Sequence, residues 1–137
     1  MSHRFPIRVY YEDTDLGQVV YYANYLRFIE RGRTEWLRAA GVDQPRLLAD
    51  HGIAFVVRRV EADYLRPARF DDLLDVVTTL DHAGGSRIEL TQTVERDGAV
   101  LFSAQVRLVC VDLSAMRPAR LPAAVRAAIG AAEEEGE

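Results

Sequence analysis

Three carboxylates lie within four positions near the start of the chain: Glu12, Asp13 and Asp15. They follow an alternating, strand-like segment from Arg4 to Glu12, and they precede a turn at Gly17 that leads into the longest helical pattern. The first N–H groups of a helix have no intrahelical acceptor and carry partial positive charge. A carboxylate beside such donors can attack, or deliver water to, an activated carbonyl whose developing oxyanion the N–H groups stabilise.

Asp15 also has a purely structural interpretation. Aspartate and threonine, as in the segment EDTD, are typical turn residues because their side chains bond the nearby backbone. The physics of the sequence alone favours this turn interpretation of Asp15. Glu12 and Asp13 are candidate second acids, but turn formation and solvation explain them better. The apolar segment that follows, LGQVVYYANY, fits a substrate channel or ordinary core burial.

Length and composition limit the possible classes of protein. The 137 residues and the 49% apolar content predict a single folded domain, residues 1–137, with a flexible acidic tail from about residue 130 to residue 137. No apolar run approaches the roughly 20 residues of a membrane helix. The N-terminus lacks the apolar region of a signal peptide, so we expect a cytoplasmic protein. A net charge of −4 argues against nucleic-acid binding.

The sequence offers no set of metal ligands and no motif for a cofactor. His3, His51 and His82 lie far apart and lack the spacing of a metal site. The only cysteine, Cys110, lies inside the apolar strand pattern VRLVCVD. A buried, inert thiol is the favoured interpretation of Cys110 over a nucleophile.

The main helix is expected from Asn24 to Ala40. Its apolar residues recur at helical spacing, Asn24 is the expected N-cap, and Gly41 is the expected C-terminal stop. Gly32 falls on the apolar stripe in mid-helix, where glycine costs about 1 kcal/mol relative to alanine. Either a close approach of a neighbouring element to Gly32 or simple tolerance explains this choice.

The rest of the chain is predominantly strand-like. Alternating patterns predict strands over 54–64, 73–82, 86–96 and 100–112. Asp97-Gly98 predicts a tight hairpin turn, and 82–85 the preceding turn. Short helices are expected over 47–51 and 123–132. This order predicts an α+β fold in which one long helix packs across a curved antiparallel sheet.

Three segments together resemble one family of enzymes. The segment VYYEDTDLGQVVYYANYLRFIERGRTEWL, then AFVVRRVEADYLRPARFDDLL and VRLVCVDLSAMRPARLP, resemble the hotdog-fold acyl-CoA thioesterases of the 4-hydroxybenzoyl-CoA thioesterase-like group. Within that group the chain is most similar to the Tol-Pal-associated acyl-CoA thioesterases. The resemblance implies a hotdog fold, thioester hydrolysis without a cofactor, and assembly into homo-oligomers, either dimers or tetramers.

The resemblance also implies roles for particular residues. It makes Asp15 the catalytic carboxylate, as nucleophile or general base, and the backbone N–H of Tyr22 the group that polarises the thioester carbonyl. Two positions depart from the pattern: Tyr22 stands where many Tol-Pal-associated members have histidine, and Gln18 where glycine or histidine is frequent. The substrate is expected to contact a further set of residues: Leu16, Gly17, Val19, Val20 and Tyr25 at the acyl end, and Arg58, Arg59, Arg66 and Arg87 as candidate phosphate ligands.

Two carriers and two rival functions remain open at this point. Coenzyme A and acyl carrier protein both present a phosphopantetheine arm, so either can carry the acyl group. A hotdog dehydratase would need a histidine paired with an acid, and none of the three histidines is suitably placed. A non-catalytic acyl-thioester-binding protein or scaffold linked to cell-envelope machinery is the second rival.

Overall fold

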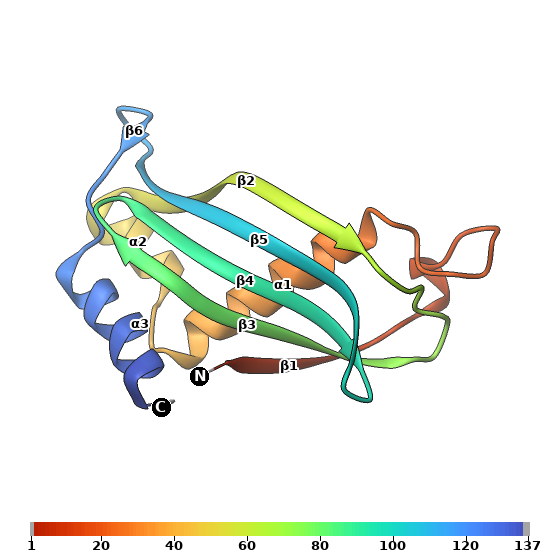
Figure 1. Ribbon diagram of the computed structural model, residues 1–137. Helices are drawn as coiled ribbons and strands as arrows, with labels where there is room; N and C mark the ends of the chain where they lie inside the picture. The colour runs from red at the N-terminus through yellow and green to blue at the C-terminus, as the bar shows by residue number, and fades with distance from the viewer. Residues whose placement is uncertain (1, 136–137) are drawn as a thin grey trace.

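A computed structural model describes residues 2–135 of the chain as one curved antiparallel sheet around a long helix (Figure 1). The strand order in the sheet is β1-β3-β4-β5-β2, and a short β6 pairs with the end of β5. The elements in chain order are β1 (His3–Arg8), the 3-10 helix η1 (Tyr11–Asp13), α1 (Asn24–Ala39), α2 (Gln44–His51), β2 (Ile53–Tyr64), β3 (Leu73–Gly84), β4 (Arg87–Arg96), β5 (Ala99–Asp112), β6 (Arg117–Pro118) and α3 (Ala123–Glu135).

The sheet curves around α1, which packs against β1, β3 and β4. The helices α2 and α3 lie at one end of the sheet, and the loop between β1 and α1 projects at the other end (Figure 1). This arrangement confirms the predicted α+β architecture. None of the helices in the described part of the chain is long and apolar enough to span a membrane.

One face of α1 is buried over its whole length, because apolar side chains recur at helical spacing along it. The helix ends at Ala39, one residue before the predicted end, and Gly41 follows the C-cap residue Ala40 with a φ of +90°, in the left-handed region that glycine adopts without strain. The predicted N-cap is wrong, because Asn24 is the first helical residue and the N-cap position is Ala23. Instead, the buried Asn24 side chain donates from Nδ2 to the Asp13 carbonyl at 2.8 Å.

Several other boundaries differ from the sequence patterns for local reasons. The first strand ends at Arg8, since residues 11–13 turn into η1. The second helix begins at Gln44, because the Asp43 side chain accepts the Arg46 N–H and caps it. The last helix runs to Glu135, so residues 130–135 of the predicted flexible tail are helical, whereas residues 136–137 lie outside the described residues.

The hairpin between β4 and β5 forms as predicted. Both turn residues, Asp97 and Gly98, have positive φ values of 51° and 81°. A turn with positive φ at both central residues matches the twist of the flanking strands. The turn between β3 and β4 is tighter than predicted, because β3 continues to Gly84.

Gly32 marks the closest approach of α1 to the sheet. A Cβ atom at this position would lie 2.3 Å from Cγ1 of Val76 on β3. Beside it, the buried Gln92 side chain on β4 donates from Nε2 to the Ile29 carbonyl and accepts from Nη1 of the buried Arg33 at 3.0 Å. A buried amide of this kind joins helix and sheet only while its partners stay in register. The tight packing therefore requires glycine at position 32.

We expect Gly32→Ala to lower the free energy of unfolding by about 1–2 kcal/mol, measured by urea denaturation. Because the added Cβ would overlap the stiff Val76 side chain heavily, we take the cost of overpacking from the upper part of the usual range, about 2–3 kcal/mol. The better helix propensity of alanine returns about 1 kcal/mol. The matched control is Gly130→Ala in α3, where the new Cβ meets no atom within 4 Å. That control should leave stability unchanged or raise it, and a Gly32 variant as stable as the wild type would contradict the packing argument.

Candidate active site

The acidic segment folds into a tight hairpin over residues 13–21. Thr14 and Val20 form an antiparallel bridge at its centre. On either side of that bridge, the Tyr21 N–H donates to the Asp13 carbonyl at 2.9 Å and the Asp15 N–H donates to the Val19 carbonyl at 3.0 Å. These three pairings define the 13–21 hairpin and bring the acidic strand next to the strand that enters α1.

Asp15 lies at the start of the turn that closes the 13–21 hairpin. Its carbonyl accepts the Gln18 N–H at 2.9 Å, and Gln18 has a φ of 66°, which explains why glycine also suits this position. One carboxylate oxygen, Oδ1, accepts the Gly17 N–H at 2.9 Å. Oδ2 has no hydrogen-bond donor within residues 2–135, and the residue is exposed. The turn interpretation is correct for one oxygen and leaves the second oxygen available for chemistry.

Two backbone N–H groups at the entrance to α1 are also without acceptors. Neither the Tyr22 N–H nor the Ala23 N–H donates to any group in the described part of the chain. Their direction is fixed nevertheless, because the N–H and C=O of one peptide point in opposite directions. Both carbonyls face the helix, since the Tyr21 carbonyl accepts the Asn24 N–H at 2.8 Å and the Tyr22 carbonyl accepts the Tyr25 N–H at 3.4 Å. The Tyr22 carbonyl also accepts the Tyr64 hydroxyl at 3.1 Å. Both N–H groups therefore point away from the helix.

The residues expected at the acyl end fall into two groups. Val20 and Tyr25 are buried in the protomer, where the Tyr25 ring stacks on Phe102 at 5.1 Å between ring centroids. Val19 is half-buried, and Gly17 and Leu16 are exposed, Leu16 fully. Val20 and Tyr25 thus support the hairpin from beneath, and the exposed residues surround Asp15.

A second loop, residues 65–72, holds the 13–21 hairpin in place. The Val20 N–H donates to the Ala68 carbonyl at 2.8 Å, and the Ala68 N–H donates to the Tyr25 hydroxyl at 3.0 Å. Burial of the Tyr25 hydroxyl raises its pKa above the ordinary value of 10.0, so the group stays neutral at physiological pH. Sequence reasoning missed Ala68, since its contribution comes entirely from the backbone.

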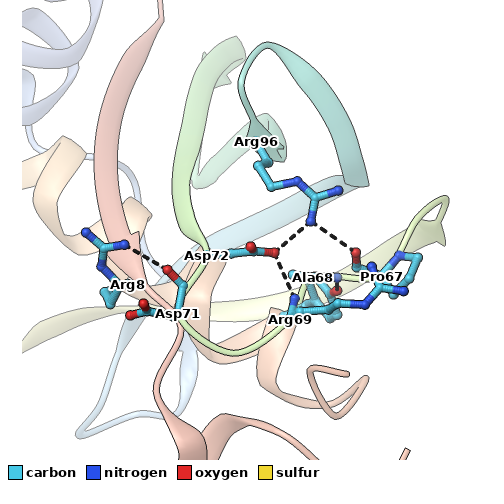
Figure 2. Close-up of polar contacts among 8 residues, drawn as sticks. Arg8, Pro67, Ala68, Arg69, Asp71, Asp72 and Arg96 are labelled. Atoms are coloured by element: carbon cyan, nitrogen blue, oxygen red, sulfur yellow. Dashed lines mark hydrogen bonds and ion pairs between the residues drawn. The ribbon is translucent and has the colours of Figure 1, made fainter. Parts of the chain in front are cut away.

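Side chains in turn fix the 65–72 loop (Figure 2). The Asp72 carboxylate oxygen Oδ2 accepts from Nη1 of Arg96 at 2.6 Å and from the Arg69 N–H at 2.8 Å. Arg8 donates to the Asp71 carbonyl at 2.7 Å from the other side of the loop. The segment RPARFDD could have indicated part of this arrangement, because its final aspartate, Asp72, is a residue type that often closes a loop.

The four candidate phosphate ligands differ in their surroundings. Arg59 pairs with Glu61, and Nε of Arg87 lies 3.7 Å from Oε1 of Glu89. Arg58 lies at the register shift of β2 between Val57 and Arg59, where one extra residue breaks the ladder. The guanidinium groups of Arg58 and Arg66 have no acidic partner among the side chains of residues 2–130, and both residues are exposed.

Comparisons with known proteins indicate a class of enzyme that is consistent with the geometry of the site. The profile of the Thioesterase-like superfamily matches residues 9–129. The acyl-CoA thioesterase YbgC of Haemophilus influenzae is 47% identical over 124 residues, covering 90% of this chain and 91% of the relative. The crystal structure of a probable thioesterase from Bartonella henselae, 37% identical, has a TM-score of 0.84 and covers 89% of this chain and 100% of that chain.

The structure of a more distantly related protein is similar to this chain in its fold alone. It is a mutant 4-hydroxybenzoyl-CoA thioesterase in complex with 4-hydroxybenzoyl-CoA, 18% identical with a TM-score of 0.88, covering 93% of this chain and 98% of that chain. The chain thus has the hotdog fold and belongs to the thioesterase-like superfamily. Its activity is the hydrolysis of acyl-CoA thioesters. The predicted family and the predicted class of activity are both confirmed.

Proposed function

We propose that Asp15 and the Tyr22 N–H together hydrolyse acyl-CoA thioesters. The supporting observation is that one hairpin carries a carboxylate oxygen and leads to a backbone N–H, neither of which has a hydrogen-bond partner among the residues that the structure describes. The N–H polarises the thioester carbonyl and stabilises the oxyanion that forms, a contribution of roughly 3–4 kcal/mol for such a donor. The similarity to acyl-CoA thioesterases supports coenzyme A as the carrier.

The carboxylate can act by two routes from the same position. As nucleophile, Asp15 forms a bond to the acyl carbon and expels the coenzyme A thiolate, and water then hydrolyses the mixed anhydride. As general base, Asp15 takes a proton from water, whose oxygen attacks the acyl carbon and expels the thiolate. Both routes consume one water and give a free carboxylic acid and a thiol.

We expect Asp15→Asn to lower kcat for acyl-CoA hydrolysis by at least about a hundredfold, the lower bound for a residue in acid–base catalysis. Asparagine keeps the oxygen that accepts the Gly17 N–H, so the fold and substrate binding should persist. Release of free thiol from a panel of aliphatic and aromatic acyl-CoA substrates measures the rate.

The matched control is Glu12→Gln, which neutralises an exposed acid of the same loop and should leave the rate within about twofold, as expected for a surface substitution. An Asp15→Asn variant with near-normal turnover would contradict the mechanism. A wild-type protein that binds every acyl-CoA of the panel without releasing thiol would favour the non-catalytic scaffold instead.

The phosphates of the carrier are proposed to bind Arg58 in preference to Arg59 or Arg87. Arg59 and Arg87 already have acidic partners, whereas Arg58 is exposed at the bulge of β2 and pairs with none of the described acidic side chains. An arginine of this kind offers a forked donor to phosphate at little cost in broken contacts. Acyl carrier protein remains the alternative carrier, and a cytoplasmic location fits either one.

We expect Arg58→Gln to raise KM for an acyl-CoA about tenfold, since a charge-assisted hydrogen bond contributes roughly 1.5 kcal/mol or more. KM for the matching acyl-pantetheine, which lacks the nucleotide phosphates, should not change. Arg59→Gln is the control, because its guanidinium is already paired with Glu61. Equal effects of Arg58→Gln on both substrates would rule out phosphate recognition by Arg58.

The active protein is proposed to be a homo-oligomer, a dimer or a tetramer, that covers the open side of the site. The edge strand β1 is only six residues long and contains Pro6, whereas the edge strand β2 has twelve residues and exposes Val56 and Val57. A long edge with exposed apolar side chains favours pairing with a second chain. Exposed aromatic rings also cluster at the entrance to α1, where the ring centroids of Tyr22 and Tyr64 lie 6.1 Å apart.

We expect the wild type to sediment as a dimer or tetramer of the 15.4 kDa chain at micromolar concentration. Val57→Asp should weaken this association at least about tenfold, because it places a charge in an apolar contact. Leu48→Asp on α2 is the control, since Leu48 is 49% exposed and Val57 is 47% exposed. Sedimentation velocity would contradict the proposal if the wild type is a monomer, or if both variants dissociate equally.

A further inference from the structure

We propose that Asp72 and Arg96 form a positioning pair for thioester hydrolysis. The proposal rests on the proposed roles of Asp15 and the Tyr22 N–H. Neither side chain of the pair belongs to the 13–21 hairpin, and neither is assigned contact with the substrate. The proposed effect on the reaction passes through the 65–72 loop to the backbone that carries both reacting groups, and Figure 2 shows the contacts of the pair with that loop.

The pair fixes the backbone on both sides of Ala68. The Asp72 carboxylate accepts the Arg69 N–H at 2.8 Å, directly after Ala68. Nη1 of Arg96 bonds the same carboxylate at 2.6 Å and points to the Pro67 carbonyl at 3.5 Å, directly before Ala68. Arg96 is the last residue of β4, so the pair ties the loop to the rigid sheet.

Ala68 transmits this constraint by two backbone hydrogen bonds. It is fully buried, its carbonyl accepts the Val20 N–H at 2.8 Å, and its N–H donates to the Tyr25 hydroxyl at 3.0 Å. Val20 is two residues before Tyr22, and Tyr25 lies in the first turn of α1. The Ala68 peptide therefore fixes the chain on both sides of the Tyr22 N–H.

The same contact reaches Asp15 across the hairpin. Val20 pairs with Thr14, and the next pairing joins Val19 to Asp15. A shift of Ala68 would thus move the carboxylate and the N–H relative to each other. A misplacement of about 1 Å at a reacting centre can cost on the order of a hundredfold in rate. A small loop displacement is therefore more costly to catalysis than to folding.

The Asp72–Arg96 pair itself contributes little to the free energy of unfolding. Its side chains are 30% and 23% exposed, and pairs of such exposure contribute roughly 0–1 kcal/mol. The Arg107–Glu89 pair on the sheet has a similar exposure of 35% and 31%, and a similar N–O distance of 3.0 Å. It joins β4 to β5 without touching either loop. The two pairs form a matched comparison that separates positioning from general stabilisation.

The test compares Asp72→Ala, Asp72→Asn and Glu89→Ala in the full-length protein. We expect Asp72→Ala to lower kcat at least about tenfold with KM within about twofold, the pattern for an interaction needed only in the transition state. Asparagine keeps an oxygen acceptor for the Arg69 N–H and Arg96, so Asp72→Asn should restore kcat to within about threefold of the wild type. Glu89→Ala should leave kcat unchanged. Arg96→Gln serves as the second variant if Asp72→Ala fails to fold.

A readout independent of activity follows the Val20 and Ala68 amide protons. NMR-detected hydrogen exchange should be faster at both amides in Asp72→Ala than in Glu89→Ala or the wild type, because Ala68, which takes part in both hydrogen bonds, is no longer held in place. Unchanged kcat in Asp72→Ala, with an active wild type and an inactive Asp15→Asn, would overturn the positioning role. Equal losses in Asp72→Ala and Glu89→Ala would also overturn it. An active Asp15→Asn would instead refute the proposed function, whatever the exchange data show.

Discussion

The two hydrogen bonds made by the backbone C=O and N–H of Ala68 are the constraint on which the rest of the site depends. One holds Val20 in the 13–21 hairpin, and the other holds Tyr25 at the start of α1. A buried peptide is suited to this task, because breaking either bond would leave a polar group unpaired away from water. The Asn24 side chain adds a third contact between the acidic turn and the helix entrance, because its Nδ2 donates to the Asp13 carbonyl at 2.8 Å.

The position of α1 on the sheet supplies the other half of the geometry. Gly32 lets the helix backbone come down onto Val76, and Gln92 ties the Ile29 carbonyl to the sheet. The helix therefore cannot slide along its axis without breaking a buried amide contact. Tyr22 lies two residues before this helix, so the register of α1 on the sheet also limits where the chain at Tyr22 can lie.

Much of the fold could be predicted because its signals are local. Helical spacing defined α1 almost to the residue, and Asp97-Gly98 defined its hairpin. The acidic segment was identified as a candidate site from its residue types, and the family of the chain was identified from sequence motifs. The contact between Asp72 and Arg96 could not be found in this way, because 24 positions separate the two residues, even though Asp72 is a typical residue for closing its own loop. Asn24 was misjudged for a related reason: its side chain bonds back across 11 positions to Asp13 instead of capping the helix.

The burial of Cys110 has a practical benefit for enzymology. The residue lies in the interior of β5 with no exposed surface, and burial raises the pKa of its thiol. A buried neutral thiol reacts slowly with the disulfide reagents used to detect sulfhydryl groups. The thiol of released coenzyme A can therefore be measured with such a reagent while the protein itself contributes little signal. Single-turnover experiments, in which enzyme exceeds substrate, should thus be free of the background that surface cysteines create.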